Sequence, residues 1–164
     1  KVSISTEDLD TKGLDFESSY LTSFANGNGG EIFTPTFTNT SITDGDLVVV
    51  VEKMQTCPST NNTFEQKGFY EYVDGVIKLY NEVDDGEAGT ACIVELKYTL
   101  KDFDNFDLDT MQIVFVDMNG IETYASMCVY EDKIYSEDDI FKVDGNIICL
   151  CQNGEIVCEE ELFD

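Results

Sequence analysis

The chain has 164 residues, of which 34 are acidic and nine are basic, and its formal net charge is −25. An apolar fraction of 42% is sufficient for a folded core, whereas the negative charge repels nucleic-acid phosphates and anionic membranes. The absence of histidine and arginine removes Ser-His and Cys-His nucleophile pairs, imidazole metal ligands and bidentate phosphate clamps. We therefore predict no enzymatic activity, no nucleic-acid partner and no insertion into a membrane.

The N-terminal residues 1–30 are polar and end in a glycine-rich stretch, so we predict a loose arm or an edge strand. An alternating pattern favours a strand at Val2-Ser3-Ile4. The chain begins at Lys1 without an initiator methionine or an apolar segment, which predicts a mature form whose signal peptide has been removed.

Residues 31–127 contain one strand pattern after another and no helical period. Glu31–Thr38 alternates, and Pro35 predicts an edge position for it. Asp46–Met54 contains four successive valines, a pattern typical of a central strand that is packed on both faces.

Two dipeptides further along this region, Asp74-Gly75 and Asn119-Gly120, predict tight hairpins. Together with the alternating strand Thr90–Leu100 they bring the number of predicted strands to about eight. We therefore predict an all-β fold, an antiparallel β-sandwich of the jelly-roll or immunoglobulin-like kind. The strands expected to flank the two dipeptides are Gly68–Val73, Val76–Tyr80, Met111–Met118 and Ile121–Val129.

Five oxygen-bearing side chains follow the Thr90–Leu100 strand within eight residues. Calcium takes six to eight oxygen ligands from carboxylates, amides and carbonyls, so this segment is a candidate Ca²⁺ site. The alternative is a solvated acidic turn whose apolar residues fill the core. The candidate ligands are Asp102, Asp104, Asn105, Asp107 and Asp109. Three weaker acidic clusters, each more typical of a turn, are Asp84–Glu87, Glu137–Asp139 and Asp44–Asp46.

The chain has six cysteines and no paired C-x-x-C spacing, which favours three disulfides over a zinc site. Disulfides predict an oxidising compartment, and two glycosylation sequons, at Asn39 and Asn61 in segments expected to be loops, agree with secretion. Six cysteines can pair in fifteen ways. A bridge between Cys57 and Cys92 would connect two predicted strand ends. The six cysteines are Cys57, Cys92, Cys128, Cys149, Cys151 and Cys158.

The C-terminal segment 128–160 resembles the first half of a von Willebrand factor type C domain and, by pattern, the related fibronectin type I module. The residues that carry the resemblance are Cys128, Tyr135, Phe141, the pair Cys149-x-Cys151, Gly154 in a predicted turn, and Cys158. The chain departs from the family at Phe141, where tryptophan is usual, and near Asn146, where a cysteine is expected. The second half of the family's domain is also missing.

The resemblance implies that Cys128 pairs with Cys151 and Cys149 with Cys158, which leaves Cys57 for Cys92. It also implies a cysteine-rich β module over 128–164 that makes protein contacts outside the cell. A unit of this size buries too little apolar surface to fold without covalent links.

We expect a secreted structural or adhesive subunit that contacts copies of itself or another extracellular protein. Self-assembly would use Ca²⁺ to offset the negative charge and residues 1–24 to add a strand to a neighbouring copy. The alternative is a recognition module that binds a protein or a carbohydrate. A carboxylate-pair hydrolase and a protease inhibitor are minor alternatives. The candidate aromatic residues for a carbohydrate are Phe69, Tyr70, Tyr72 and Tyr80.

Overall fold

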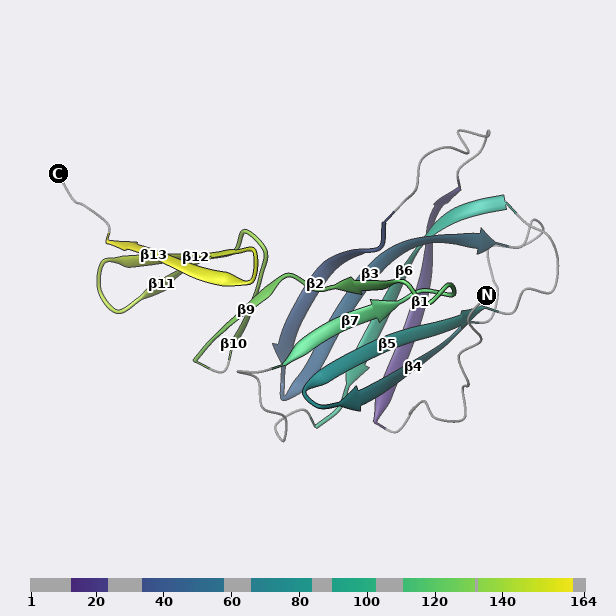
Figure 1. Cartoon of the computed structure of the whole chain (residues 1–164), viewed down its shortest axis with the longest axis horizontal. Coiled ribbons are helices and arrows are strands. Elements are labelled where there is room, and N and C mark those ends of the chain that lie inside the picture. Colours follow the sequence, from purple (N-terminus) through teal and green to yellow (C-terminus); the bar gives the residue numbers. More distant parts are fainter. Residues whose placement is uncertain are drawn as a thin grey trace.

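The computed structural model describes residues 13–23, 34–57, 66–83, 90–102, 111–131 and 133–160. In these ranges the strands form two four-stranded sheets, one two-stranded sheet and one three-stranded sheet. Figure 1 shows the two larger sheets on one side of the molecule and the smaller sheets on the other. The predicted all-β fold with a small disulfide-bonded β appendage is confirmed.

The first large sheet is antiparallel, in the order β1 (Leu14–Ser23), β6 (Thr90–Leu100), β3 (Asp46–Cys57) and β2 (Thr36–Thr43). The valine-rich strand β3 lies between β6 and β2, in the central position that its sequence predicts. Within the polar segment 1–30, β1 pairs with β6 as an edge strand, whereas the alternating residues 2–4 lie outside the described residues.

Strand β2 begins later and extends further than the pattern at Glu31–Thr38 predicts, and residues 31–33 lie outside the described residues. The expectation that Asn39 lies in a loop is wrong, since it lies in β2, next to an irregularity in the pairing with β3. The segment holds Thr38, Thr40 and Ile42, and such β-branched residues favour a strand. Asn39 is nevertheless exposed, as a glycan would require; the second sequon lies outside the described residues.

The second large sheet has the order β4 (Gln66–Val73), β5 (Val76–Val83), β7 (Gln112–Val116) and β8 (Glu122–Tyr124). The prediction of antiparallel pairing is wrong at one place, because β5 and β7 are parallel. The chain leaves β5, passes through β6 in the opposite sheet and returns, so that β7 runs in the same direction as β5.

The Asp74-Gly75 hairpin forms as predicted, with φ of 52° at Asp74 and 80° at Gly75 between β4 and β5. The Asn119-Gly120 connection differs, since only Gly120 has a positive φ and the strand after it ends at Tyr124. Here the Asp117 side chain accepts hydrogen bonds from the backbone N–H groups of Asn119 and Ile121, so a longer turn replaces the two-residue one.

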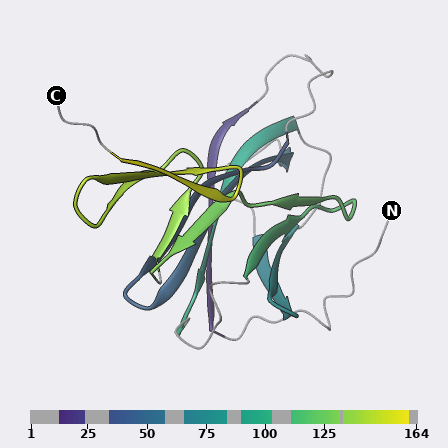
Figure 2. The same cartoon turned by 60° about the vertical axis from the view of Figure 1, so that its left-hand side comes forward.

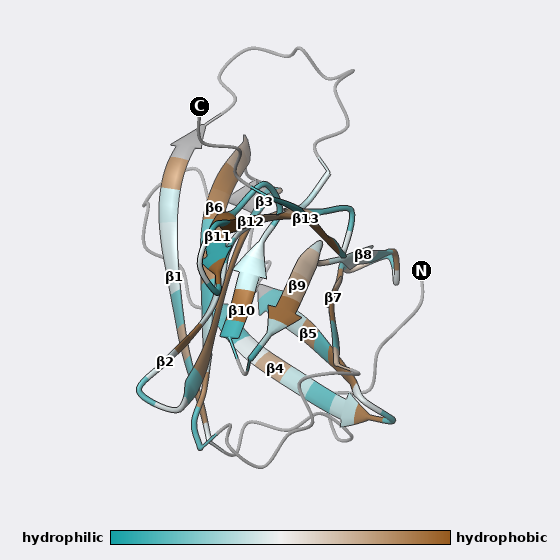
Figure 3. Ribbon diagram, turned by 90° about the vertical axis from the view of Figure 1, so that its left-hand side faces the viewer, coloured by the Kyte–Doolittle hydropathy of each residue, from teal (hydrophilic) through white to brown (hydrophobic). Residues whose placement is uncertain are grey.

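The main core lies between the two large sheets. Its members alternate along β3, β5, β6 and β7, so each strand contributes one face, and Figure 3 shows the hydrophobic colour along β7. Figure 2 shows the same layers from a second direction. Residues with no exposed surface in this core are Leu47, Val49, Val51, Ile77, Leu79, Cys92, Val94, Leu96, Tyr98 and Phe115.

One edge of the sandwich closes through contact between β1 and β4. The Phe16 ring packs against the buried Tyr98 ring, with centroids 5.1 Å apart, and lies directly over Gly68. A Cβ atom at position 68 would lie 2.2 Å from Cδ2 of Phe16, so only glycine leaves space for the ring. This glycine therefore determines how closely the two edge strands approach.

A polar network continues the core toward one end of the sandwich. Lys53 is only 3% exposed, its Nζ donates to Oδ1 of Asn81 at 3.0 Å, and it lies 5.5 Å from the centre of the Phe115 ring. The amide nitrogen of Asn81 donates to Oε1 of Gln55 and of Gln66, at 3.4 and 3.0 Å. Buried polar groups cost free energy unless they are paired, so this network positions β3, β4 and β5 specifically.

The chain then leaves the sandwich through a hairpin of β9 (Met127–Tyr130) and β10 (Lys133–Ser136). It ends in an antiparallel sheet of β11 (Ile140–Val143), β12 (Ile147–Gln152) and β13 (Glu155–Glu160), which we call the C-terminal sheet. In Figure 1 the hairpin lies between the sandwich and this sheet.

Candidate functional site

The β9–β10 hairpin has two contact faces, because side chains alternate along a strand. On one face, Met127 and Ile134 pack against the sandwich core. On the other, Cys128 is paired with Tyr135 in the strand register and forms a disulfide with Cys151 of β12. The hairpin thus connects the sandwich to the C-terminal sheet through apolar packing on one side and a covalent bond on the other.

Aromatic side chains fill the space between the hairpin and the C-terminal sheet. Phe141 is 8% exposed and stacks on Tyr135, with centroids 3.9 Å apart, while Tyr130 lies 5.6 Å away. Burial, and then the negative charges of Glu131 and Asp144, raise the pKa of the Tyr130 hydroxyl. The aromatic side chain at position 141 therefore forms the centre of a small second core.

The second disulfide, Cys149–Cys158, joins two residues that lie directly opposite each other on β12 and β13. Both disulfides that the resemblance implies for this segment are present. Cys92 also takes part in a disulfide, but the side chain of Cys57 lies outside the described residues, so the Cys57–Cys92 pairing stays a prediction.

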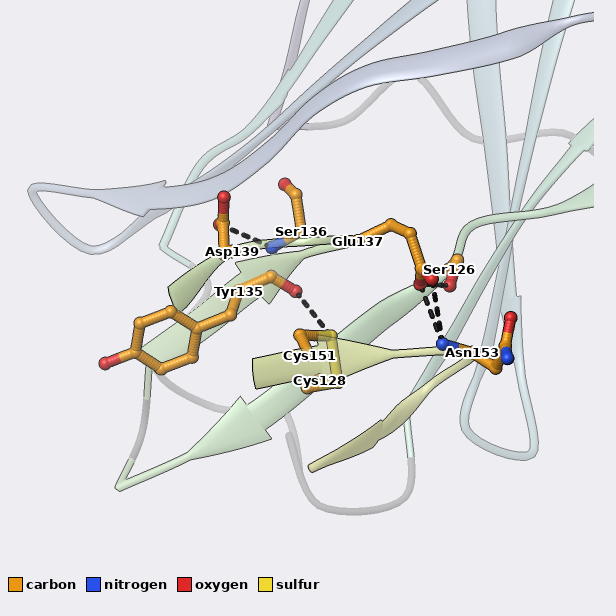
Figure 4. The surroundings of a disulfide bond; sticks show 8 residues. All are labelled: Ser126, Cys128, Tyr135, Ser136, Glu137, Asp139, Cys151 and Asn153. Carbon is orange, nitrogen blue, oxygen red and sulfur yellow. Dashed lines mark hydrogen bonds between the residues drawn. A yellow bond between two sulfur atoms is a disulfide. The ribbon is translucent and has the colours of Figure 1, made fainter. Parts of the chain in front are cut away.

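The turn between β10 and β11 is held by Glu137, as Figure 4 shows. Its carboxylate accepts hydrogen bonds from the Ser126 hydroxyl and from the Asn153 backbone N–H, the latter at 2.9 and 3.0 Å. The Ser126 bond, and then the Asn153 bond, lower the pKa of the Glu137 carboxyl. Glu137 thereby connects the end of the sandwich to the β12–β13 turn.

The remaining carboxylates of the acidic cluster 137–139 also have structural contacts nearby. Asp139 accepts a hydrogen bond from the Ser136 backbone N–H at 2.8 Å, and its carbonyl accepts one from the Cys151 N–H at 3.0 Å. The Asp138 N–H donates to the Cys151 carbonyl at 2.8 Å. The cluster thus fixes a turn against β12, which agrees with the alternative that such clusters are turns.

The outward face of the C-terminal sheet carries an apolar row across all three strands. The register pairs Ile140 with Leu150 and Leu150 with Val157, so the three side chains lie side by side; we call them the Ile140 row. Ile140 is 71% exposed and Val157 is 46% exposed, while Leu150 is half-buried. Exposed apolar side chains that are adjacent in this way are typical of contact surfaces.

None of the sequence motifs singles out this row, although a signal for it is present. Cys149 and Cys151 are separated by one residue and face the same side of β12, so Leu150 must face the other side. The segment 128–160 also contains nine acidic residues and only two lysines. The Ile140 row is therefore an apolar part of a strongly acidic segment.

The predicted calcium ligands are only partly described. The backbone N–H of Asp102 donates to Oδ1 of Asp46 at 3.2 Å, whereas the other four candidates, at positions 104, 105, 107 and 109, lie outside the described residues. Among the residues that are described, no group of three or more potential ligands is close enough to hold a metal ion. The calcium site stays a prediction.

Of the two remaining acidic clusters, 84–87 lies outside the described residues. In the other, the Asp46 carboxylate forms an ion pair with Lys101, 3.2 Å from Oδ2 to Nζ, and Asp15 lies 3.5 Å from the same Nζ. These carboxylates, Asp46 first, raise the pKa of Lys101. Asp46 therefore connects the ends of β3 and β6, and exposed pairs of this kind contribute little stability.

Comparison with protein-family models, with curated proteins and with solved structures finds no match for this chain. Within the described ranges, none of the elements is a helix long and apolar enough to cross a bilayer. The two disulfides indicate an oxidising environment, and the part of the chain that contains them is a small disulfide-bonded β region. The class defined by fold and site is thus a disulfide-stabilised all-β protein.

Proposed function

We propose that the protein is a secreted recognition subunit that binds a basic protein partner through the Ile140 row. In this proposal the sandwich supports the C-terminal sheet, and the C-terminal sheet provides the surface that contacts the partner. Binding requires no catalysis, no nucleic acid and no insertion into a membrane. The observation that supports this proposal is a row of three adjacent apolar side chains, two of them exposed, on a sheet that two disulfides hold in place.

A preorganised surface suits recognition because less conformational entropy is lost when a partner binds. The disulfides, the Phe141–Tyr135 stack and the Glu137 hydrogen bonds all restrict the C-terminal sheet relative to the hairpin. None of these contacts uses Ile140 or Val157, which stay exposed. The apolar row is therefore available to a partner at low entropic cost.

The charge around the row indicates the kind of partner. On the same face, the rows next to the apolar centre contain Glu155 and Glu159 of β13 and Lys142 of β11. This net acidic border matches a partner with apolar side chains surrounded by lysines and arginines. A net charge of −25 would also increase the association rate with such a partner at low ionic strength. The resemblance to the von Willebrand factor type C family adds an independent reason to expect extracellular protein contacts.

The test is a binding screen against purified secreted and cell-surface proteins, with the affinity of each binder measured at several salt concentrations. We expect a partner with a basic surface, binding that weakens as salt increases, and loss of at least about tenfold in affinity for Ile140→Asp. Ile121→Asp is the matched control, because Ile121 is 62% exposed but lies on the sandwich.

Equal affinity of Ile140→Asp and the wild type for every binder would contradict the proposal, as would partners that are consistently acidic. Both variants should keep the wild-type melting temperature, since each changes an exposed side chain.

A second candidate function is self-assembly by exchange of β1. It is favoured by the position of β1, an edge strand near the start of the chain that pairs with β6 over its whole length. In such an exchange, β1 of a neighbouring copy would pair with β6 in the register that the chain's own β1 uses. Bound Ca²⁺ would reduce the repulsion between the acidic copies. Light scattering with Ca²⁺ and with EDTA tests this; a monomer in both, or an unchanged oligomer after deletion of residues 1–24, would exclude it.

A further inference from the structure

A second surface lies on the outer face of the β4–β5–β7–β8 sheet, on the sandwich itself. Its register places Glu71, Lys78, Val114 and Tyr124 in one row across all four strands. Val114 is fully buried and forms part of a small second apolar cluster with Tyr80, Val116 and, at its margin, Phe69 and Val76. The apolar cluster is therefore covered by its neighbours, and the groups available to a ligand on this face are the polar and aromatic side chains around it.

The polar side chains around this cluster form hydrogen bonds and an ion pair with one another. Nζ of Lys78 lies 3.2 Å from Oε1 of Glu122, and the Tyr124 hydroxyl donates to Oε2 of the same carboxylate at 3.0 Å. On the opposite side, the Tyr80 hydroxyl donates to Oε2 of Glu71 at 3.3 Å. These bonds bring two carboxylates and one ammonium together above the sheet, where they can accept and donate further hydrogen bonds.

Tyr124 is 58% exposed, and its hydrogen bond indicates the direction of its ring. Glu122 is two residues away on the same strand and the same face, so a hydroxyl that reaches it requires a ring inclined along the strand. With more than half of its surface exposed, the Tyr124 side chain is accessible to a ligand. Tyr124 is therefore an exposed aromatic ring beside the Glu122–Lys78 pair.

We propose that this face binds a neutral oligosaccharide. A pyranose ring has an apolar side of C–H groups, which can stack on an exposed aromatic ring, and a border of hydroxyls, which pair with carboxylates and ammonium groups. The net charge of −25 disfavours sulfated or uronic-acid glycans, so the class of ligand is neutral.

The four aromatic residues that the sequence suggests for carbohydrate binding lie on two different faces of this sheet. Phe69 and Tyr80 lie on this outer face, in directly paired positions. Tyr70 and Tyr72 lie on the opposite face, where Tyr70 packs against the main core. Tyr124, which the sequence analysis did not select, is the exposed ring at this site.

The experiment is native affinity electrophoresis of the full chain in gels that contain a neutral polysaccharide, with dextran, hydroxyethyl cellulose, soluble xylan and glycol chitin as probes and dextran sulfate as the anionic comparison. We expect at least one neutral polysaccharide to slow the protein, with no effect of dextran sulfate. Tyr124→Ala should weaken the apparent affinity about tenfold, since one aromatic stacking contact accounts for up to about that factor.

Tyr72→Ala is the matched control, because it removes a 39% exposed tyrosine from the other face of the same sheet and should leave the retardation unchanged. Tyr124→Phe keeps the ring but loses the bond to Glu122, so it should fall between the wild type and Tyr124→Ala. The proposal is overturned if none of the neutral probes slows the protein, if dextran sulfate slows it more than dextran, or if Tyr72→Ala and Tyr124→Ala have equal effects. Ile140→Asp should bind these probes as the wild type does, which separates this site from the Ile140 row.

Discussion

The sandwich and the C-terminal sheet are both antiparallel β-structures for the most part, yet they are stabilised in different ways. Between the large sheets, aliphatic and aromatic side chains from four strands have no exposed surface, and a single disulfide-bonded cysteine, Cys92, lies among the described core residues. In the segment 128–160 the described buried apolar residues are Phe141 and three cysteines, and all three cysteines form disulfides.

The comparison shows how size determines the means of stabilisation. A larger fold buries enough apolar surface to offset its conformational entropy, whereas a small sheet cannot and requires covalent links. The sheet that depends on disulfides is also the one that exposes Ile140 and Val157, because it does not need those side chains for a core. Four changes to the protein test this contrast.

The largest effect is expected from Leu96→Ala in the centre of β6. Leu96 is fully buried, and the cavity left by truncation of such a side chain costs about 2–5 kcal/mol of unfolding free energy. Denaturant unfolding followed by circular dichroism measures this loss. Leu21→Ala, which truncates a leucine that is 44% exposed in β1, should cost far less, and equal effects would contradict the assigned core.

Removal of the Cys149–Cys158 disulfide by alanine at both positions should act on the C-terminal sheet alone. A disulfide that closes a short loop contributes about 3 kcal/mol in the chain-entropy account. Hydrogen exchange should show loss of protection in β12 and β13 with unchanged protection in β3 and β6. Simultaneous loss of protection in β3 and β6 would mean that the two regions unfold as one unit.

Gly68→Ala should destabilise the sandwich by about 1–3 kcal/mol, because the added methyl group occupies the position of the Phe16 ring. The double variant with Phe16→Ala provides the control, since it removes the clash. Its unfolding free energy should exceed the value expected from adding the two single effects. Strict additivity would show that the ring and the glycine are not in contact.

The smallest effect on stability is expected from Tyr80→Phe, and it should appear only at alkaline pH. Burial, and then the charge of Glu71, raise the pKa of Tyr80 from 10.0 to about 12, so the folded state favours the neutral phenol. The stability contributed by this shift is complete below pH 10.0 and is lost as the pH rises through about 12. Tyr80→Phe should therefore show a shallower fall in melting temperature across this window, and Tyr72→Phe should follow the wild type.

Local patterns predicted much of the fold correctly. The Asp74-Gly75 turn has the positive φ angles that its residues favour, and so does Asn153-Gly154 between β12 and β13. The valine run forms β3, which pairs with a strand at each edge, as the β-branched and continuous apolar pattern predicts. Such features depend on neighbours in the chain, and they could be predicted for that reason.

Features that depend on distant contacts could not be predicted. Lys53 and Gln55 lie on the core-facing side of β3, and their hydrogen bonds with Asn81 of the other sheet offset part of the cost of their burial. The sequence of the polar strand β1 shows little alternation of polar and apolar residues. Its extended conformation depends on backbone pairing with β6. Asn39 was expected in a loop, since its polar neighbours mask the β-branched residues of an edge strand.

For the candidate site, residue identity and backbone geometry are sufficient to predict the acidic charge, the cysteines and the two-residue period of the strands. The three-dimensional arrangement of the strands is needed to place Ile140, Leu150 and Val157 in one row, and to bring Tyr124 and Lys78 to the same Glu122 carboxylate. Strand register and sheet order place these residues together, and both depend on contacts between segments that are far apart in the chain.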